Sequence, residues 1–377
     1  MKPTRRSATI IATVTAAAGL LAGSGVLATS ANASDTFIGG LTHTKIVAST
    51  IPQNGDVNPY GVAGVPRSTG NLQRGDVLVS NFNDNTNTQG TGTTIVQVNP
   101  HGGASLFASV SDPSCPGGVG LTTALVVLRS GWVIVGSLPT QNGGTLSGAG
   151  CLIVLDQFGQ VRNTITGYGI DGPWDMTALD GGNVSELFVT NVLGGILGPN
   201  PNANGGTVQR LLITSGPGEA PQVVKSTQIG SGFSAHTDPA ALVVGPTGVG
   251  LGPNGTLYVA DTANSRIAAI PNAVFRSKDD GTGSTVSEGN ALNVPLGLAI
   301  APNGHILTVN GGDGNMVETR PDGTQVATVT VDNNQGGGGN LFGLAVKPGA
   351  DAVYFVDDFG GGTNNIPPAQ NNLQILF

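Results

Sequence analysis

The segment from Pro295 to Val331 predicts one complete four-stranded antiparallel sheet. Its apolar or alternating runs at 296–300, 306–309, 316–320 and 325–331 are separated by small or turn-forming residues, including Pro-Asn-Gly and Pro-Asp-Gly. In these turns proline presets φ and the next residues tolerate positive φ, as tight reversals between strands require. A single sheet of this size cannot bury both of its faces, so the unit must recur if it is to build a domain.

The unit does recur, most clearly in its front half, which is a strand, a short turn, and a second strand that ends in Asn, Asp or Ser. The last copy is one strand short, and the alternating segment His43 to Thr50 has no hairpin partner of its own. We therefore predict an all-β, six-bladed β-propeller, with the ring closed by the mature N-terminal strand joining the C-terminal blade. The predicted blades span residues 59–110, 121–166, 173–229, 246–288, 295–331 and 341–377.

The N-terminus has the layout of a secretory signal peptide. Lys2, Arg5 and Arg6 precede an apolar and small-residue stretch, and Ala-Asn-Ala at 31–33 forms an A-x-A cleavage site. We expect residues 1–33 to be removed, residues 34–377 to form a single domain, and the protein to be secreted without a membrane span. The paired arginines leave the export route open between the general and the twin-arginine pathways.

The mature chain is expected to be acidic. The leader contains three basic and no acidic residues, so the remainder has 12 Lys and Arg against 23 Asp and Glu, a net charge of −11. An acidic surface repels nucleic acid and anionic lipid, which argues against both classes of partner. The chain has 61 glycines without a collagen period and only 10% charged residues, a composition that fits β-structure with many turns.

The sequence contains two cysteines, Cys115 and Cys151. In an exported protein a pair of cysteines normally forms a disulfide. This disulfide would close a loop of roughly 35 residues and contribute about 4 kcal/mol by the chain-entropy estimate. Neither cysteine lies in a nucleophile motif, which argues against a catalytic role.

The segment Gly252 to Ile270, GPNGTLYVADTANSRIAAI, resembles the NHL repeat, whose typical form ends in YVAD-x-x-N-x-R-I. The last two predicted blades resemble it more weakly, because they keep a strand-ending Asn310 or Asp357 but lack the Asn-x-Arg. The resemblance implies a six-bladed propeller. Propellers of this type include the peptidyl-amidating lyase and streptogramin lyase enzymes as well as many binding modules, so it indicates architecture more than activity.

Loop lengths indicate which face of the propeller carries a site. In blades with strands A to D, the A–B and C–D turns share one face, and most of these turns are short. The B–C loops and D–A links share the other face, and loops of their length usually bind a ligand or move. We therefore predict a site on this long-loop face, at the mouth of the channel. The long segments are 82–92, 111–120, 138–150, 192–206, 231–245, 333–340 and 359–370.

A polar residue ends strand B of every predicted blade. A ring of such residues has two interpretations. The first is a set of oxygens that binds a hard cation or a polyhydroxylated ligand. The second is a local hydrogen bond to the backbone, repeated because the fold repeats. Asp261 and Asp357 are the candidates for binding Ca²⁺ or another divalent cation, since a carboxylate can accept a backbone hydrogen bond and also bind a cation. The six residues are Asn81, Ser137, Asn191, Asp261, Asn310 and Asp357.

His236 is the candidate acid/base residue, because it is the histidine predicted to lie in a long loop on the favoured face, two residues before Asp238. Histidine with a carboxylate can bind a metal or act as a general base. A solvated loop histidine is the simpler alternative. Asp175 is predicted near the channel mouth, and the preceding Trp174 fits either interblade core or a platform for a sugar ring.

Two functions remain in competition. The first is a monomeric extracellular binding or scaffold propeller, whose long loops hold a glycan, peptide or protein. The second is a metal-assisted lyase or hydrolase with a cation in the channel and His236 as acid/base. An enzyme of that kind is expected to place at least two His or Glu residues with an Arg at the channel. Only one histidine and few glutamates are suitably placed, which favours the binding function.

Overall fold

The computed structural model describes residues 36–193, 204–216, 218–239, 241–333, 338–358 and 371–377. Residues Ser34–Phe377 belong to one compact unit, and the predicted leader lies outside the described residues. No helix within the described ranges has the length and apolarity needed to cross a membrane.

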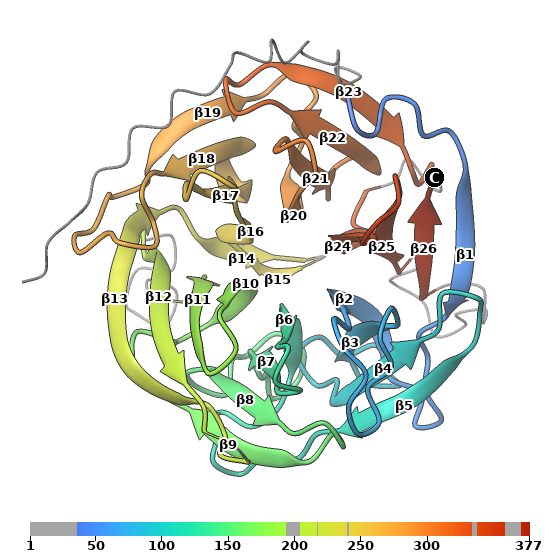
Figure 1. The fold of residues 1–377 in the computed structure, drawn as a ribbon, viewed down its shortest axis with the longest axis vertical. Helices are drawn as coiled ribbons and strands as arrows, with labels where there is room; N and C mark the ends of the chain where they lie inside the picture. Colours follow the sequence, from blue (N-terminus) through green and yellow to red (C-terminus); the bar gives the residue numbers. More distant parts are fainter. Residues whose placement is uncertain (1–35, 194–203, 217, 240, 334–337, 359–370) are drawn as a thin grey trace, which may run out of the picture. The chain divides into compact units, whose positions relative to one another are not determined.

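Six four-stranded antiparallel sheets form a ring around a central channel (Figure 1), which confirms the all-β, six-bladed propeller. Blade 1 contains β2 (Val57–Gly64), β3 (Val77–Asn83), β4 (Thr94–Val98) and β5 (Ala104–Ser109). Blade 2 contains β6 (Leu121–Val127), β7 (Val133–Ser137), β8 (Cys151–Leu155) and β9 (Val161–Ile165). Blade 3 contains β10 (Pro173–Asp180), β11 (Val184–Asn191), β12 (Gly206–Thr214) and β13 (Gln222–Phe233).

The remaining blades follow in chain order. Blade 4 contains β16 (Pro246–Leu251), β17 (Leu257–Asp261), the 3-10 helix η1 (Thr262–Asn264), β18 (Arg266–Ile270) and β19 (Ser284–Glu288). Blade 5 contains β20 (Pro295–Ile300), β21 (Ile306–Asn310), β22 (Asn315–Thr319) and β23 (Gln325–Thr330). Blade 6 contains β24 (Leu341–Val346), β25 (Val353–Asp357), β26 (Asn372–Leu376) and β1 (Thr44–Ser49).

Strand β1 is the outermost strand of blade 6. It pairs antiparallel with β26, from Thr44 opposite Leu376 to Ser49 opposite Asn372, so the first and last strands lie in one sheet. Figure 1 shows the blue β1 beside the red β26. The segment before β1 is also anchored, because the main-chain N–H groups of Phe37 and Ile38 donate to the buried carboxylate of Glu318 in β22.

Apolar side chains fill the space between neighbouring blades. Alternate residues of each strand point to opposite faces of its sheet, so every inner sheet face packs against the next blade. One buried cluster joins blades 1 and 2 through residues such as Leu78 and Val135, and another joins blades 4 and 5 through residues such as Tyr258 and Val317. The innermost strand of each blade contacts the innermost strands of both neighbours, including β2 with β24.

A β-bulge interrupts every innermost strand near its middle, where the pairing with the second strand shifts register. In four blades the bulge carries a glycine, namely Gly61, Gly248, Gly297 and Gly343. A Cβ added to Gly297 or Gly343 would lie 2.1 Å from a carbonyl oxygen of the next blade. Close approach of neighbouring backbones therefore requires glycine at these positions.

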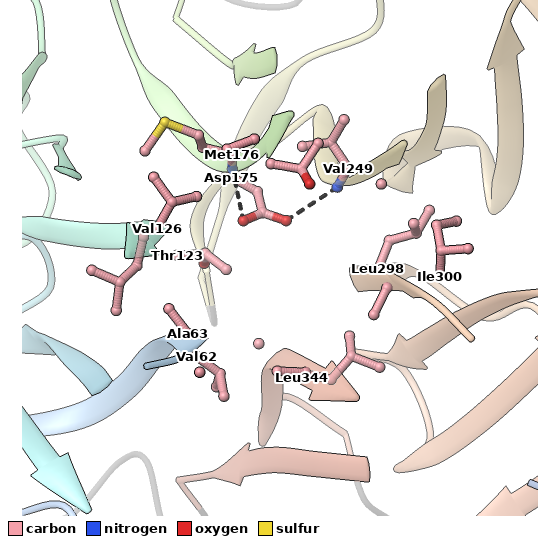
Figure 2. A pocket seen from close by; sticks show the side chains of 18 of the residues that line it. Val62, Ala63, Thr123, Val126, Asp175, Met176, Val249, Leu298, Ile300 and Leu344 are labelled. Carbon is pink, nitrogen blue, oxygen red and sulfur yellow. Dashed lines mark hydrogen bonds between the residues drawn. The ribbon is translucent and has the colours of Figure 1, made fainter. Parts of the chain in front are cut away.

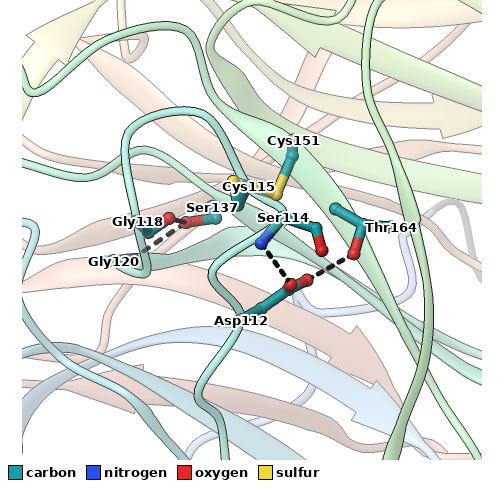
Figure 3. The surroundings of a disulfide bond; sticks show 8 residues. All are labelled: Asp112, Ser114, Cys115, Gly118, Gly120, Ser137, Cys151 and Thr164. Atoms are coloured by element: carbon teal, nitrogen blue, oxygen red, sulfur yellow. Dashed lines mark hydrogen bonds between the residues drawn. A yellow bond between two sulfur atoms is a disulfide. The ribbon is translucent and has the colours of Figure 1, made fainter.

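The predicted disulfide is confirmed. Cys115 and Cys151 are bonded, with Cα atoms 5.6 Å apart, and both are buried. Figure 3 shows the bond beside Asp112, whose carboxylate accepts hydrogen bonds from the Ser114 N–H and the Thr164 hydroxyl. The bond ties the link between blades 1 and 2 to the start of β8.

The expectation of a long loop at 231–245 was wrong. This segment contains the end of β13 and a small hairpin of β14 (His236–Asp238) and β15 (Leu242–Val244). Ala241 and the residues of β15 are buried in one cluster with Tyr60, Trp174 and Phe342 from the first halves of the innermost strands. The Trp174 indole N–H donates to the Val243 carbonyl at 3.0 Å. The hairpin thus fills the channel toward the long-loop face.

Candidate functional site

A polar pocket with a volume of about 490 Å³ lies on the long-loop face, between blades 1, 2 and 6. Seven side chains give it its chemistry, and we call it the amide pocket. They are Asn58, Asn83, Asn87, Gln89, Asn142, Asn340 and Asp358. Amide groups both donate and accept hydrogen bonds, so such a wall can recognise a polar ligand without carrying much charge.

Two asparagines of blade 1 are held so that their side-chain oxygens lack a partner. Asn58 adopts a φ of 59°, a region that asparagine tolerates, and its main-chain N–H donates to Asn371 Oδ1. Asn83 donates from Nδ2 to Asn87 Oδ1 at 2.6 Å. Both residues are 2% exposed, and neither Oδ1 has a hydrogen-bond partner. A buried acceptor left in this state costs about 1–3 kcal/mol, which a ligand can recover.

Asp358 supplies the carboxyl group of the pocket. It follows β25, is 6% exposed, and its Oδ1 has no hydrogen-bond partner. Burial raises the pKa of Asp358 well above its usual value, and the nearby carboxylates of Asp357 and Asp332 raise it further. No salt bridge to Asp358 occurs in the part of the chain that the structure describes. This group therefore favours the protonated form, or the ionised form beside a bound cation.

Tyr60 lies in β2, two residues after Asn58, and belongs to the buried core. Its ring stacks between Phe342 and Phe82, with centroids 4.0 and 4.4 Å away. Burial raises the pKa of Tyr60 well above its usual value, and the Asp358 charge adds to the rise. The aromatic stack gives the polar residues above it a rigid support, since buried rings pack with little freedom.

The comparisons with known proteins agree with this architecture. Residues 244–270 match the family model of the NHL repeat. The chain is a six-bladed β-propeller that carries an NHL repeat. No curated protein matches its sequence significantly.

Several solved structures share the fold of this NHL propeller. A gluconolactonase from Xanthomonas campestris is 14% identical, with a TM-score of 0.52 over 87% of this chain and 88% of that one. A calcium-binding protein, regucalcin, from Agrobacterium tumefaciens is 13% identical, with a TM-score of 0.54 over 88% and 93%. Virginiamycin B lyase from Staphylococcus aureus is 12% identical, with a TM-score of 0.51 over 89% and 99%. At these identities the likeness shows the fold alone.

Four of the polar residues predicted to end the second strands are buried and form hydrogen bonds with the link that precedes their blade. Asn81 donates to the Thr50 carbonyl at 3.0 Å, and Asn310 donates to the Ala291 carbonyl at 2.7 Å. Asn191 Oδ1 accepts from the Asp171 N–H at 3.2 Å. Ser137 accepts from the Gly120 N–H at 2.9 Å, and none of these side chains lines the amide pocket. Each bond holds a residue of the D–A link that precedes the blade, so the repeat has a structural use for these residues.

The two carboxylates predicted as cation ligands differ in their surroundings. Asp261 is fully buried and binds the Arg266 guanidinium at 2.7 Å and Asn264 Nδ2 at 3.0 Å. Asp357 accepts a hydrogen bond from Gln374 Nε2 at 2.8 Å. Across the described ranges, no cluster of three or more His, Cys, Asp and Glu side chains is arranged to hold a metal. Their role as metal ligands stays a prediction.

The structure separates the other candidates. His236 lies in β14 opposite Val244 and does not line the amide pocket. Asp238 accepts from the Ala241 N–H at 2.9 Å, which supports the hairpin turn. Asp175 lies deep in the channel and lines a different cavity, described below. Trp174 belongs to the buried core, as one of its two interpretations required.

Sequence analysis did not select the residues that line the amide pocket. Asp358 follows the predicted Asp357 at the end of β25, and Asn83 is the last residue of β3, which extends two residues beyond the predicted strand end at Asn81. The only sequence signal was the density of asparagine in segments 82–92 and 333–340.

Proposed function

We propose that the protein binds a small polyhydroxylated molecule, such as the end of a glycan, in the amide pocket. The observation that carries this proposal is the presence of three buried side-chain oxygens without partners, on Asn58, Asn83 and Asp358, in one pocket. Hydroxyl groups can donate to oxygens of this kind, and an apolar ligand cannot. Several long loops contribute to the pocket, as expected for a binding propeller that is secreted and acts outside the cell.

A divalent cation such as Ca²⁺ is the second candidate for the same pocket. It is favoured by the uncompensated carboxyl of Asp358 beside Asp357 and Asp332, and the regucalcin that shares this fold is described as calcium-binding. Asn58, Asn83 and Asp358 would hold the ion through hard oxygen ligands, which suit Ca²⁺. Ca²⁺ takes about six to eight oxygens, so three side chains would leave most positions to water. We therefore rank the polyol first.

Binding is favoured over catalysis as the function of this pocket. Its lining contains one carboxyl group and neither His nor Glu. General acid–base chemistry uses positioned groups that exchange protons, and usually two of them. The lyase or hydrolase hypothesis with His236 as acid/base has no support from the lining of this pocket.

The test is binding of the mature protein to a glycan array, followed by calorimetric titration of the best carbohydrate and, separately, of CaCl₂. Asn83→Ala should weaken carbohydrate binding by about tenfold or more, because it removes one acceptor. Asp358→Asn keeps an acceptor oxygen, so it should retain carbohydrate binding but abolish Ca²⁺ binding.

Asn310→Ala is the matched control. Asn310 is as buried as Asn83 and also has an Oδ1 without a partner, but it lies outside the pocket. This variant should bind the carbohydrate as the wild type does. The proposal fails if no carbohydrate binds, or if Asn83→Ala and Asn310→Ala weaken binding equally.

A further inference from the structure

A second cavity occupies the half of the central channel that faces the A–B turns. It has a volume of about 390 Å³ and is lined by the second halves of the innermost strands of all six blades. Figure 2 shows these side chains around an open centre, with aliphatic groups such as Val126, Leu298 and Leu344 on several sides and the carboxyl of Asp175 on one. The cavity is separate from the amide pocket, since no residue lines both.

Asp175 departs from the pattern of the repeat. It stands in the bulge of β10, after Pro173 and Trp174, where blades 4 and 5 have Gly248 and Gly297 after the same spacing from proline. In those blades a side chain does not fit at this position. A Cβ added to either glycine would lie 2.4 Å or less from a main-chain atom of the next blade. At blade 3 the carboxylate takes that place, so the fold itself does not require an acid here.

The carboxylate of Asp175 is held but not neutralised. Oδ1 accepts from the Met176 N–H at 2.8 Å, and Oδ2 accepts from the Val249 N–H of the next blade at 3.1 Å. No salt bridge to it occurs among the described residues, and Asp175 is 9% exposed. A buried carboxylate without a cation is costly, so a bound cation would relieve it.

The other titratable group that lines the cavity is also acidic. Asp180 lies at the end of β10, near the A–B turn, where its carboxylate accepts from the main-chain N–H groups of Arg129 and Gly182 at 2.7 and 2.8 Å. Of the residues that line this cavity, none carries a basic side chain. The ionisable groups that line the cavity are therefore acidic, which favours entry of a cation.

We propose that this half of the channel binds a primary alkylammonium ion, with the ammonium group on Asp175 and the alkyl chain along the aliphatic walls. An ammonium has three donors, and one can bind the carboxylate. The others can reach carbonyl groups on the innermost strands, which are edge strands with an unpaired side toward the channel. A divalent cation fits less well, since it needs more charged oxygens and gains nothing from an apolar wall.

The test is calorimetric titration of the mature protein at pH 8 with n-butylammonium chloride, with n-butanol as an uncharged ligand of similar shape. The ammonium should bind, and the alcohol should bind at least about tenfold more weakly, because a charge-assisted hydrogen bond is lost. Asp175→Gly, which restores the residue of four other blades, and Asp175→Asn should both reduce ammonium binding by at least about tenfold.

Proton linkage gives a second readout that a purely structural carboxylate would not produce. Burial raises the pKa of Asp175 to about 7. Binding of the ammonium ion should therefore be about tenfold weaker at pH 6 than at pH 8, since the carboxyl must ionise first. Titration near pH 7 in two buffers of different ionisation enthalpy should show proton release.

The controls separate this proposal from that for the amide pocket. Asn83→Ala should bind n-butylammonium as the wild type does, and thermal unfolding should show that both Asp175 variants are folded. The inference is overturned if the wild type does not bind n-butylammonium, if the folded variants bind it equally well, or if n-butanol binds as tightly.

Discussion

The buried carboxylates of this propeller differ in what compensates their charge. Asp261 faces Arg266, and Glu318 accepts from two main-chain N–H groups and from His305 Nδ1 at 2.6 Å. Asp175 and Asp358 have no cationic partner among the described residues. The charges of the first pair are therefore compensated within the fold, whereas ionisation of the second pair leaves buried charges without a cation.

Asp175 should make the stability of the protein fall as the pH rises. Its pKa is raised to about 7 in the folded state by burial, above its ordinary value of 3.8, so the folded protein holds the proton more tightly than the unfolded chain. Relative to Asp175→Asn, the wild type should lose up to about 4 kcal/mol of unfolding free energy between pH 4 and pH 8. Urea unfolding of both proteins at several pH values measures this difference.

Comparing the two proteins at each pH isolates the carboxyl group, because their other titrations cancel. If the asparagine itself changes the unfolding free energy by a constant amount, the difference between the two proteins shifts equally at every pH, and its dependence on pH is unchanged. A difference that stays flat from pH 4 to pH 8 would show that the carboxylate ionises at its ordinary pKa.

At the level of single residues, the sequence predicts position better than role. The spacing of the repeat located Asn191, Asp261 and Asn310 at strand ends, where the structure has them, whereas β3 continues two residues beyond Asn81. The sequence did not distinguish a residue whose side chain forms a hydrogen bond with the backbone of a link from one that faces a pocket. That distinction depends on the path of the B–C loops, which carry no periodic pattern.

At the level of elements, the innermost strands combine pairing with close packing. Each pairs with its neighbour on one side, bends at its bulge, and touches the innermost strand of the next blade. The bulge raises the local twist and lets the backbones approach. Glycine is required where a carbonyl of the adjoining blade occupies the space of a Cβ.

Gly343→Ala should destabilise the protein by about 2–3 kcal/mol, because its Cβ would lie 2.1 Å from the Tyr60 carbonyl oxygen and the backbone would have to move. Gly64→Ala is the matched control on another innermost strand, where an added Cβ meets nothing within 4 Å. It should change stability by less than about 0.5 kcal/mol. Chemical denaturation measures both. Equal effects would mean that strand propensity, rather than contact between blades, determines the cost.

The strands were predictable where two turn signals bracket an apolar run. The unit at 295–331 has strands within one residue of their predicted bounds, because Pro-Asn-Gly and Pro-Asp-Gly fix its turns. The hairpin of β14 and β15 was missed because each strand has three residues, too few for a period to appear. Its burial depends on the channel, which exists only once six blades have assembled.

At the level of the whole molecule, the N-terminal segment completes blade 6. Strand β1 covers the edge of β26, and Phe37 and Ile38 belong to the core of blades 5 and 6. An exposed edge strand offers unpaired N–H and C=O groups to other chains. The segment therefore adds core and covers an edge at the same time.

A chain that begins at residue 51 should unfold at a clearly lower temperature than a chain that begins at residue 34 and should self-associate, because β26 becomes an open edge. A chain that begins at residue 43 keeps β1 but loses Phe37 and Ile38. It should be destabilised by lost burial, at about 1.5–3 kcal/mol for each large side chain, and stay monomeric. Light scattering and thermal denaturation measure both effects. A monomeric chain from residue 51 with unchanged stability would contradict the role of β1.

The hairpin of β14 and β15 has a consequence for access to the central channel. With Ala241 and β15 packed against Tyr60, Trp174 and Phe342, apolar side chains occupy the axis toward the long-loop face. No residue lines both the amide pocket and the cavity of Asp175, so separate substitutions can change one without touching the lining of the other.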